Sequence, residues 1–344
     1  MAFFRQELAI DLGTANTVIF KDDKVVLDEP SIIAIETKTE KLVAIGSQAQ
    51  LMEELTPPGL TTIRPMMNGV IADYDAAEKM LGGFIRKAIG REKGIKGGIF
   101  KPALKVVIGF PGGGTPVDMR SIRDSASHAG AHELFMIYEP MASAMGIGID
   151  VNAPNGNMIV DIGGGTTEIA VISLGGIPEG ASIHVAGNEI TTDIIDYMAQ
   201  QHNISIGRKT AENIKFAVGS VLPELDPEEE PEDYIVEGKN LVTAHPATAA
   251  ISYVEISSCI DKTISKIESE IIKVLQRTSP ELYSNIVKNG IWLAGGGSLL
   301  RGIAKRFSDK INIQFRVAED PLKAVARGTC LALKATDKYS FLMK

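Results

Sequence analysis

Cysteine is scarce in this sequence, because the 344 residues include only Cys259 and Cys330, with no CxxC spacing. This usage excludes a disulfide framework and a structural zinc site, and it is typical of a reducing compartment. We therefore expect both cysteines to be buried as small apolar side chains. Long apolar runs are also missing, since none approaches the roughly 18 residues that a membrane-spanning helix needs. The N-terminal MAFFRQELAIDLG lacks the features of a signal peptide, so we expect a cytoplasmic protein.

Two common phosphate-binding motifs are absent as well. No GxxxxGKS or GxxxxGKT occurs, which excludes a Walker-type P-loop, and no GxGxxG follows an expected strand, which disfavours a Rossmann site. The formal net charge of −8 argues against a nucleic-acid partner, because phosphate backbones recruit basic surfaces. With 44% hydrophobic residues, the chain is long enough for two ordinary domains, since single cores seldom exceed roughly 250 to 300 residues.

An internal repeat is present. The stretches ELAIDLGTANTVIF and MIVDIGGGTTEIAVI each contain an apolar run, an aspartate, a glycine, a threonine and a second apolar run. The matched positions are Asp11 with Asp161, Gly13 with Gly163 and Thr17 with Thr167. Each copy predicts a strand, a tight turn and a second, antiparallel strand. One copy alone would suit an ordinary glycine-containing hairpin, but two copies in register favour a function and predict a duplicated α/β domain.

The repeated turns have the chemistry of a phosphate site. Glycine removes the Cβ that would block close approach, so the backbone N–H groups of Gly13 to Asn16 and of Gly163 to Thr166 can converge on oxygen anions. Threonine hydroxyls add donors at Thr14, Thr17, Thr166 and Thr167. Asp11 and Asp161 cannot face a bare phosphate without repulsion, so we expect a divalent cation, magnesium, to lie between carboxylate and phosphate.

A third glycine cluster occurs in NGIWLAGGGSLLRGIAKRF. The pattern predicts a strand at 291–293, a turn at Gly295, Gly296 and Gly297, and a helix that begins near Ser298 with Ser298 as its N-cap. Many strand-to-helix turns are rich in glycine for packing reasons alone, so this cluster is a weak signal by itself.

Together these motifs resemble the actin, Hsp70 and sugar-kinase ATPase superfamily, and most closely the MreB family of bacterial actins, the rod-shape proteins. Further similar stretches, in the family's order, are DEPSIIAI, EPMASAMGIG, HVAGNEI, IGRKTAENIK and VAEDPLKAVARGT. The resemblance implies an actin-like duplicated ATPase fold of the α/β class, with two domains, a smaller inserted subdomain in each, and the nucleotide in a central cleft.

The resemblance also implies domain boundaries. Domain I would comprise 1–149 and 321–344, with an insert near 33–75, and domain II would comprise 150–320, with an insert near 189–250. The helices that cross in such a fold would be YEPMASAMGIG and DPLKAVARGTCLALKA, which are rich in Ala and Gly as close packing requires.

By the same resemblance, Asp11 and Asp161 hold Mg2+ through its waters, and Glu139 places the attacking water with help from Thr166 or Thr167. The residues implied to bind the β- and γ-phosphates are Gly13, Thr14, Ala15, Asn16, Gly163, Gly164, Gly165 and Thr166. The protein would mainly position water and neutralise charge during in-line displacement. Glu139 precedes Pro140 at the start of an apolar stretch, so an acid that only complements the helix dipole is an alternative.

Gly187, Glu212 and Lys215 resemble the family's nucleoside contacts, and the cluster from Gly295 to Ser298 would lie against adenine and ribose. Glu212 and Lys215 stand at i and i+3 of a predicted helix, where an exposed ion pair is the alternative. The sequence departs from the family at GFPGGGTPVDMRSI, where Asp118 takes the acidic place, and at Ala294, where threonine is usual. These departures bear on turnover more than on binding.

The segment 86–105 carries seven basic residues and one acid, with Ile99 and Phe100 at its expected tip. It predicts contact with an anionic membrane, because basic residues near such a surface contribute about 1 kcal/mol each and apolar side chains insert. A solvated turn whose Ile99 and Phe100 return to the core is the alternative. The acidic PELDPEEEPEDY, at 223–234, predicts an exposed connection.

The resemblance implies a polymerising ATPase that binds ATP, ADP and Mg2+, hydrolyses ATP slowly and forms paired, head-to-tail protofilaments on the inner face of the cell membrane. Other shape or motility proteins are further candidate partners. An Hsp70-like module would need a substrate domain, and little more than one helix follows Asp320. A small-molecule kinase would need an acidic base in a substrate pocket, which the sequence does not reveal.

Overall fold

The computed structural model describes residues 6–55, 57–90 and 103–344. The chain divides into two compact units. Unit 1 comprises Met1–Pro154, Ile172–Pro178 and Leu322–Lys344, and unit 2 comprises Asn155–Val171 and Glu179–Pro321. This division does not test the domain boundaries expected from the sequence, which remain a prediction. No helix in the described ranges is both long enough and apolar enough to span a membrane.

Unit 1 is built on a five-stranded sheet in the order β10-β9-β1-β2-β3. Its strands are β1 (Gln6–Leu12), β2 (Asn16–Lys21), β3 (Lys24–Pro30), β9 (Leu104–Phe110) and β10 (Ala131–Tyr138). The strands β1, β2 and β3 pair antiparallel, whereas β1, β9 and β10 run parallel, so the carboxyl ends of the parallel strands meet at one edge. All seven residues of β9 are buried, as expected for a central parallel strand.

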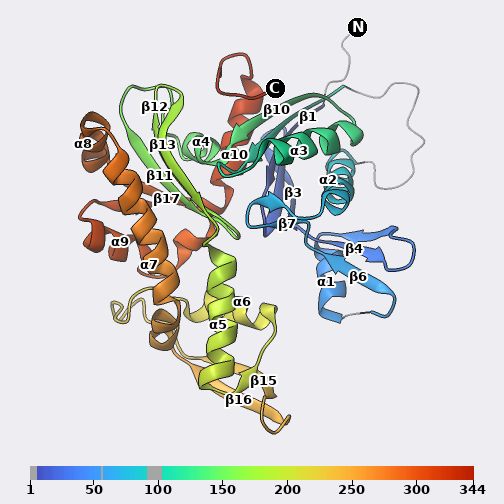
Figure 1. The fold of residues 1–344 in the computed structure, drawn as a ribbon, viewed down its shortest axis with the longest axis vertical. Coiled ribbons are helices and arrows are strands. Elements are labelled where there is room, and N and C mark those ends of the chain that lie inside the picture. The colour runs from blue at the N-terminus through green and yellow to red at the C-terminus, as the bar shows by residue number, and fades with distance from the viewer. Residues whose placement is uncertain (1–5, 56, 91–102) are drawn as a thin grey trace. The chain divides into compact units, whose positions relative to one another are not determined.

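Two helices of unit 1 cross in very close contact. The helices of this unit are α1 (Ser47–Leu55), α2 (Tyr74–Ala88), α3 (Pro116–His128), α4 (Glu139–Gly146) and α10 (Ala324–Lys334). A Cβ on Gly146 of α4 would lie 1.9 Å from the carbonyl oxygen of Ala324, and one on Gly328 of α10 would lie 1.7 Å from that of Ala142. The predicted close packing of these two helices is confirmed, and Figure 1 shows them together.

A smaller group of elements in unit 1 lies inside the insert expected near 33–75. Its strands are β4 (Ile33–Glu36), β5 (Leu42–Ile45), β6 (Leu60–Ile63), β7 (Met66–Met67) and β8 (Val70–Ile71). Glu29 at the end of β3 ties this group to the main sheet. Its carboxylate accepts hydrogen bonds from the backbone N and the hydroxyl of Ser47, both at 2.7 Å, and pairs with Lys87 at 2.6 Å.

A second five-stranded sheet, in the order β13-β12-β11-β17-β18, lies in unit 2 except for residues 172–178, which belong to unit 1. Its strands are β11 (Asn157–Ile162), β12 (Thr167–Ser173), β13 (Gly176–Ile183), β17 (Ile291–Ala294) and β18 (Phe315–Val317). The strands β11, β17 and β18 run parallel. The carboxyl ends of β11 and β17 therefore lie side by side, with Asp161 opposite Ala294.

The remaining elements of unit 2 include a separate three-stranded sheet in the order β14-β15-β16. They are α5 (Gly187–Gln201), α6 (Arg208–Val218), α7 (Tyr253–Arg277), α8 (Pro280–Asn289), α9 (Ile303–Ile311), β14 (Ile204–Ser205), β15 (Tyr234–Asn240), β16 (Pro246–Ile251) and the 3-10 turns η1 (Gly296–Leu299) and η2 (Pro321–Lys323), the last of which runs into unit 1. The acidic segment leads from α6 into β15 and is mostly exposed, as predicted, although Leu225, Pro231 and Tyr234 are half-buried.

The long helix α7 shows why the sequence of unit 2 folds as it does. Isoleucines at intervals of three and four residues, among them Ile256, Ile260 and Ile264, are fully buried and form one apolar stripe. On a neighbouring part of α7, Glu268 pairs with Arg306 of α9 at 2.6 Å, with only 4% of the glutamate side chain exposed. Asp261 joins the same guanidinium at 2.8 Å, so this ion-pair group fixes α9 against α7.

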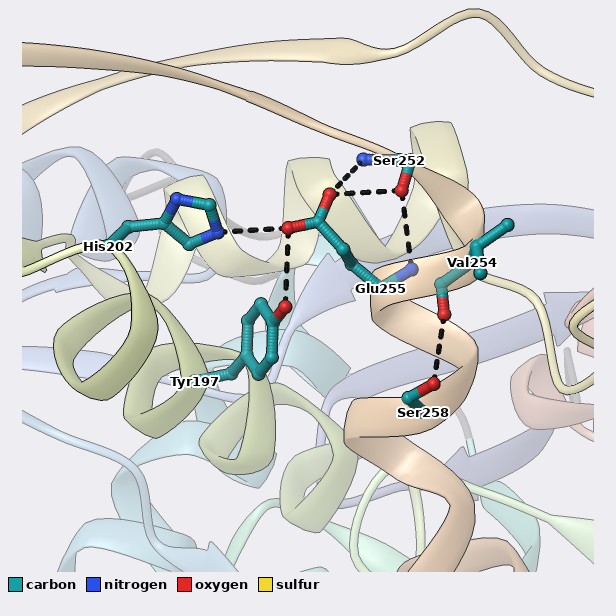
Figure 2. Close-up of polar contacts among 6 residues, drawn as sticks. All are labelled: Tyr197, His202, Ser252, Val254, Glu255 and Ser258. Atoms are coloured by element: carbon teal, nitrogen blue, oxygen red, sulfur yellow. Dashed lines mark hydrogen bonds and ion pairs between the residues drawn. The ribbon is translucent and has the colours of Figure 1, made fainter.

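Glu255 joins the N-terminus of α7 to the C-terminal end of α5, as Figure 2 shows. One carboxylate oxygen accepts hydrogen bonds from the backbone N and the hydroxyl of Ser252, both at 2.9 Å. The other accepts from the hydroxyl of Tyr197 at 3.2 Å and lies 3.0 Å from Nε2 of His202. Burial alone would raise the pKa of Glu255, but these hydrogen bonds outweigh it and the net pKa is lowered.

The lowered pKa of Glu255 predicts a loss of stability in acid. The contribution of the carboxylate is complete above 4.5, its ordinary pKa, and is lost as the pH falls through the lower pKa of the folded protein. We expect Glu255→Gln to reduce the free energy of unfolding by about 1 kcal/mol at pH 7, where it weakens the helix cap. Urea unfolding between pH 7 and pH 3.5 should show the two proteins converging in acid. The control is Glu270→Gln, which only removes a pair with Lys273 on the same helix. The assignment would be contradicted if Glu255→Gln lowered the free energy of unfolding by the same amount at every pH, or by no more than the control does.

The two cysteines are free thiols, as expected, but only Cys330 is buried. The prediction that Cys259 is buried is wrong, because this residue of α7 is only partly buried against the core. Burial is still the main cause that raises the pKa of Cys259 to about 12 and that of Cys330 to about 11. Neither thiol is therefore ionised at neutral pH.

Candidate functional site

The first hairpin, which we define as β1, the turn at 13–15 and β2, belongs to unit 1. Its strands pair antiparallel with Leu12 opposite Thr17, so the predicted strand, turn and strand are confirmed. The turn accommodates only glycine at position 13, because a Cβ there would lie 2.6 Å from the carbonyl oxygen of Asn16. Asp11 is half-buried and stands one residue before the end of β1.

Ser31, which sequence reasoning did not single out, holds this turn from behind. Its hydroxyl donates to the carbonyl oxygen of Gly13 at 2.7 Å, and its backbone N donates to that of Ala15 at 2.9 Å. The hydroxyl oxygens of Ser31 and Thr17 are 2.9 Å apart, and both residues are fully buried. The hydroxyl of Thr17 therefore faces the interior of unit 1.

Thr14 connects the first hairpin to the inserted elements. Its hydroxyl oxygen accepts a hydrogen bond of 3.0 Å from the backbone N of Gly69. Gly69 and Asn68 form the turn between β7 and β8, with left-handed φ values of 73° and 51°. Because a hydroxyl that accepts a bond still carries a proton, Thr14 keeps a donor for a second partner.

Glu139 and Asp11 lie at the same edge of the unit 1 sheet. Glu139 is the first residue of α4 and directly follows β10, whereas Asp11 lies near the end of β1. Between them, a Cβ on Gly109 of β9 would touch Cγ of Glu139 at 3.7 Å. The carboxyl ends of parallel strands are where open α/β sheets bind ligands, so the placement suits a catalytic role as well as a place in the first turn of a helix.

The second hairpin, which we define as β11, the turn at 163–166 and β12, belongs to unit 2. The backbone N of Gly163 donates to the carbonyl oxygen of Thr166 at 2.9 Å and closes the turn. Asp161 and Thr166 are each only 7% exposed. Thr167 is fully buried, and its hydroxyl donates to the carbonyl oxygen of Val185 at 2.6 Å. Of the two candidate threonines, Thr167 therefore has its hydroxyl proton engaged inside unit 2.

The start of α5 holds the second turn from behind. The backbone N of Gly187 donates to the carbonyl oxygen of Gly163 at 3.1 Å, and that of Asn188 donates to Gly164 at 2.7 Å. In a planar trans peptide the C=O and the following N–H point in opposite directions. The N–H groups of Gly164 and Gly165 are therefore turned away from α5, as a phosphate site requires.

Glu212 and Lys215 on α6 form a partly buried pair. Lys215 pairs with Glu212 at 2.8 Å and also donates to the carbonyl oxygen of Gly187 at 3.1 Å. Its side chain is 12% exposed, so the alternative of an exposed ion pair is wrong. Burial lowers the pKa of Lys215, and the carboxylate of Glu212 opposes that shift. Thr191 of α5 donates to Glu212 and accepts from Lys215, a role that no sequence motif indicated.

The third glycine cluster lies against the second hairpin. Gly295 has a left-handed φ of 76°, and a Cβ on it would lie 2.4 Å from a carboxylate oxygen of Asp161. The predicted helix start at Ser298 is wrong, because Gly296–Leu299 form a single 3-10 turn and α9 begins at Ile303 after Gly302 in the left-handed region. The hydroxyl of Ser298 instead donates to the carbonyl oxygen of Gly295 at 2.7 Å, within the loop.

The departure at Asp118 has a structural explanation. Thr115 and Asp118 form a capping box at the start of α3, in which the carboxylate accepts from the backbone N of Thr115 at 2.9 Å and from its hydroxyl at 2.6 Å. Asp118 is 5% exposed, and its carboxylate caps the N-terminus of α3. Ile99 and Phe100, the predicted membrane contact, lie outside the described residues.

Comparisons with known proteins agree with one another along the whole chain. The family model described as MreB/Mbl protein matches residues 5–340. The cell shape-determining protein MreB of Escherichia coli (strain K12) is 40% identical over 341 residues, which cover 98% of this chain and 95% of that protein. Crystal structures of MreB5 of Spiroplasma citri bound to ADP and to AMPPNP both superpose with a TM-score of 0.88, at 35% and 36% identity, and cover 97% of this chain and 98% and 97% of theirs.

A MamK double helical filament also superposes, with a TM-score of 0.78 at 21% identity, covering 97% of this chain and 99% of that one. At this identity the likeness concerns the fold alone. The predicted actin-like α/β fold class is therefore confirmed by the MreB5 and MamK structures together.

Proposed function

Because this chain belongs to the MreB/Mbl family, we propose that it is a cytoskeletal ATPase that binds ATP and ADP and assembles into filaments involved in cell shape. The observation that carries the proposal is the pair of glycine turns whose carbonyl oxygens are hydrogen-bonded from behind. In each turn this leaves backbone N–H groups directed away from the interior, where phosphate oxygens can accept from them. The nucleotide-bound MreB5 structures support the same assignment.

The residues that would contact the nucleotide follow from this proposal. The phosphates would accept from the two turns, at Gly13 to Asn16 and at Gly163 to Thr166. The partly buried group of Glu212, Lys215 and Thr191 lies directly against Gly187, and it would recognise the ribose hydroxyls through its carboxylate and ammonium. The loop from Gly295 to Ser298 would border the adenine. Each assignment is supported by the position of its residues, which lie at a strand end or near a helix start within one unit.

Magnesium would accompany the nucleotide. Asp11 and Asp161 supply carboxylate oxygens at strand ends, which suit a hard cation. The described residues contain no group of three or more His, Cys, Asp or Glu side chains that could hold a metal ion by themselves. Phosphate oxygens and water would therefore complete the coordination, and the bound ion would neutralise phosphate charge. A Cβ on Gly295 would lie 2.4 Å from a carboxylate oxygen of Asp161, so this loop lies directly against the aspartate.

Slow hydrolysis of ATP would use Glu139 to orient a water molecule towards the γ-phosphate, with Thr166 as the second candidate. Support comes from the position of Glu139 at the same carboxyl edge of the unit 1 sheet as Asp11, with β9 between their two strands. Thr167 is a weaker candidate than Thr166, since its hydroxyl proton is already donated to Val185.

Sedimentation with ATP tests the filament assignment. The purified protein should pellet with Mg2+ and ATP above a critical concentration, and negative-stain electron microscopy should show filaments of paired, head-to-tail protofilaments. The matched sample with ADP measures how assembly depends on the γ-phosphate. A protein that stays monomeric with ATP at every concentration would contradict the filament proposal, whereas absence of ATP binding in calorimetry would contradict the whole assignment.

Association with an anionic membrane surface is the finer part of the proposal, together with other shape or motility proteins as partners. It is supported by the basic sequence at 86–105 and by the apolar Ile99 and Phe100. The protein should co-sediment with vesicles that contain anionic lipid, and a double variant of Ile99→Ser and Phe100→Ser should not. Full retention of the double variant on such vesicles would exclude these residues as the anchor.

A further inference from the structure

Ser31 makes an unusual set of contacts for a residue outside the repeated motif. It follows β3 and is fully buried, yet both its hydroxyl and its backbone N donate hydrogen bonds to carbonyl oxygens of the first turn. The hydroxyl bond to Gly13 is 2.7 Å long. The neighbouring hydroxyl of Thr17, at 2.9 Å, restrains the Ser31 side chain in this orientation. Both the hydroxyl and the backbone N of Ser31 are thus restrained in their contact with the turn.

The bond to Gly13 controls the direction of a donor. The peptide that joins Gly13 to Thr14 is planar and trans, so the C=O of Gly13 and the N–H of Thr14 point in opposite directions. Because Ser31 draws the carbonyl oxygen towards the buried side, the N–H of Thr14 is held on the opposite side. Without this bond, the plane of this peptide is less restricted on its Gly13 side, because glycine has no Cβ to limit the rotation.

The equivalent position in unit 2 has the same arrangement with a different donor. Gly163 matches Gly13 in the repeat, and its carbonyl oxygen accepts from the backbone N of Gly187 at 3.1 Å. The N–H of Gly164 is thereby directed like that of Thr14. The equivalent peptide is therefore restrained in both turns, although the turns belong to different units. In unit 1 the donor is a side chain, and in unit 2 it is a backbone N–H.

We propose that Ser31 is a positioning residue for phosphate binding, which orients the N–H of Thr14 through the carbonyl oxygen of Gly13. The inference rests on the proposed binding of ATP and adds to it a residue that does not touch the nucleotide. Its hydroxyl acts only on the part of the binding free energy that comes from the phosphates. The ribose and adenine contacts, which come from other residues, are independent of it.

Isothermal titration of the full chain with ATP and with adenosine tests this role. Ser31→Ala should lower the affinity for ATP about tenfold or more, as expected for a misdirected hydrogen bond to a charged group, and leave the affinity for adenosine unchanged. Ser143→Ala is the matched control, because Ser143 is another fully buried serine of unit 1 whose hydroxyl has no hydrogen-bond partner among the described residues. The control should bind both compounds like the unchanged protein.

The outcomes separate positioning from stability. A general loosening of unit 1 would weaken ATP and adenosine alike, and that result, or an ATP affinity equal to that of the unchanged protein, would overturn the inference. If Ser31→Ala does not fold, Ser31→Cys retains a weak donor of nearly the same shape, and a selective loss of ATP affinity is again the supporting result. If the unchanged protein and Ser31→Ala bind ATP equally well, only the inference about Ser31 is contradicted. Should the unchanged protein bind no ATP, the proposed function fails first.

Discussion

Replacing Glu139 with alanine should lower the rate of phosphate release by about 100-fold or more while ATP binding changes by no more than about twofold. Glu139 stands at the carboxyl edge of the unit 1 sheet, the edge at which the strand carrying Asp11 also ends. From there it would orient water, a contribution made during the reaction and not in the bound ground state. Single-turnover phosphate release and a parallel binding titration measure the two quantities separately.

The alternative for Glu139, an acid that only complements a helix dipole, has a matched control in this chain. Glu281 also stands in the first turn of a helix, next to Pro280 at the start of α8, and it is exposed. Glu281→Ala should cost about 0.3–1 kcal/mol of stability and leave phosphate release unchanged. Equal rates in both variants would remove Glu139 from the reaction and leave it as a helix-terminal acid.

Replacing Gly328 with alanine should destabilise unit 1 severely, by about 3 kcal/mol or more. The added Cβ would lie 1.7 Å from the carbonyl oxygen of Ala142 and 2.9 Å from its Cα, so backbone atoms of α4 would have to move. Since both helices pack on the same sheet and have little room to separate, we expect a large shift in the urea midpoint, or insoluble protein.

A glycine with room around it provides the control for Gly328→Ala. A Cβ on Gly176, at the start of β13, would meet its nearest atom at 3.6 Å, an ordinary contact, and its φ is not left-handed. Gly176→Ala should therefore change the free energy of unfolding by no more than about 1 kcal/mol. A Gly328→Ala protein as stable as Gly176→Ala would mean that α4 and α10 are less closely packed than described.

The sequence predicted the features that local patterns determine. The two hairpins were predictable because aspartate, glycine and threonine interrupt apolar runs at the same spacing in both copies. The crossing helices were predictable because small residues recur in both. Both predictions depend on residues close together in the chain, where turn chemistry and helix composition act directly.

Contacts between distant segments were not predictable in the same way. Ser31 and Gly13 are 18 residues apart, and no spacing rule indicates that the hydroxyl of one reaches the carbonyl oxygen of the other. Thr191 was missed for the same reason, since it meets Glu212 only when α5 and α6 pack together. The helix start at Ser298 was misplaced because the serine hydroxyl bonds within its own loop, and the chain turns once more at Gly302 before α9 begins.

The support of the second turn by the start of α5 has a consequence for mutational tolerance. Gly187 and Asn188 use backbone N–H groups, which every residue except proline possesses, so substitutions that preserve the helix leave these two bonds intact. At the first turn, the bond to Gly13 comes from one hydroxyl, which a single substitution can delete. Single substitutions around the first hairpin should therefore change nucleotide affinity more than substitutions at position 188, which the second turn should tolerate with little change in affinity.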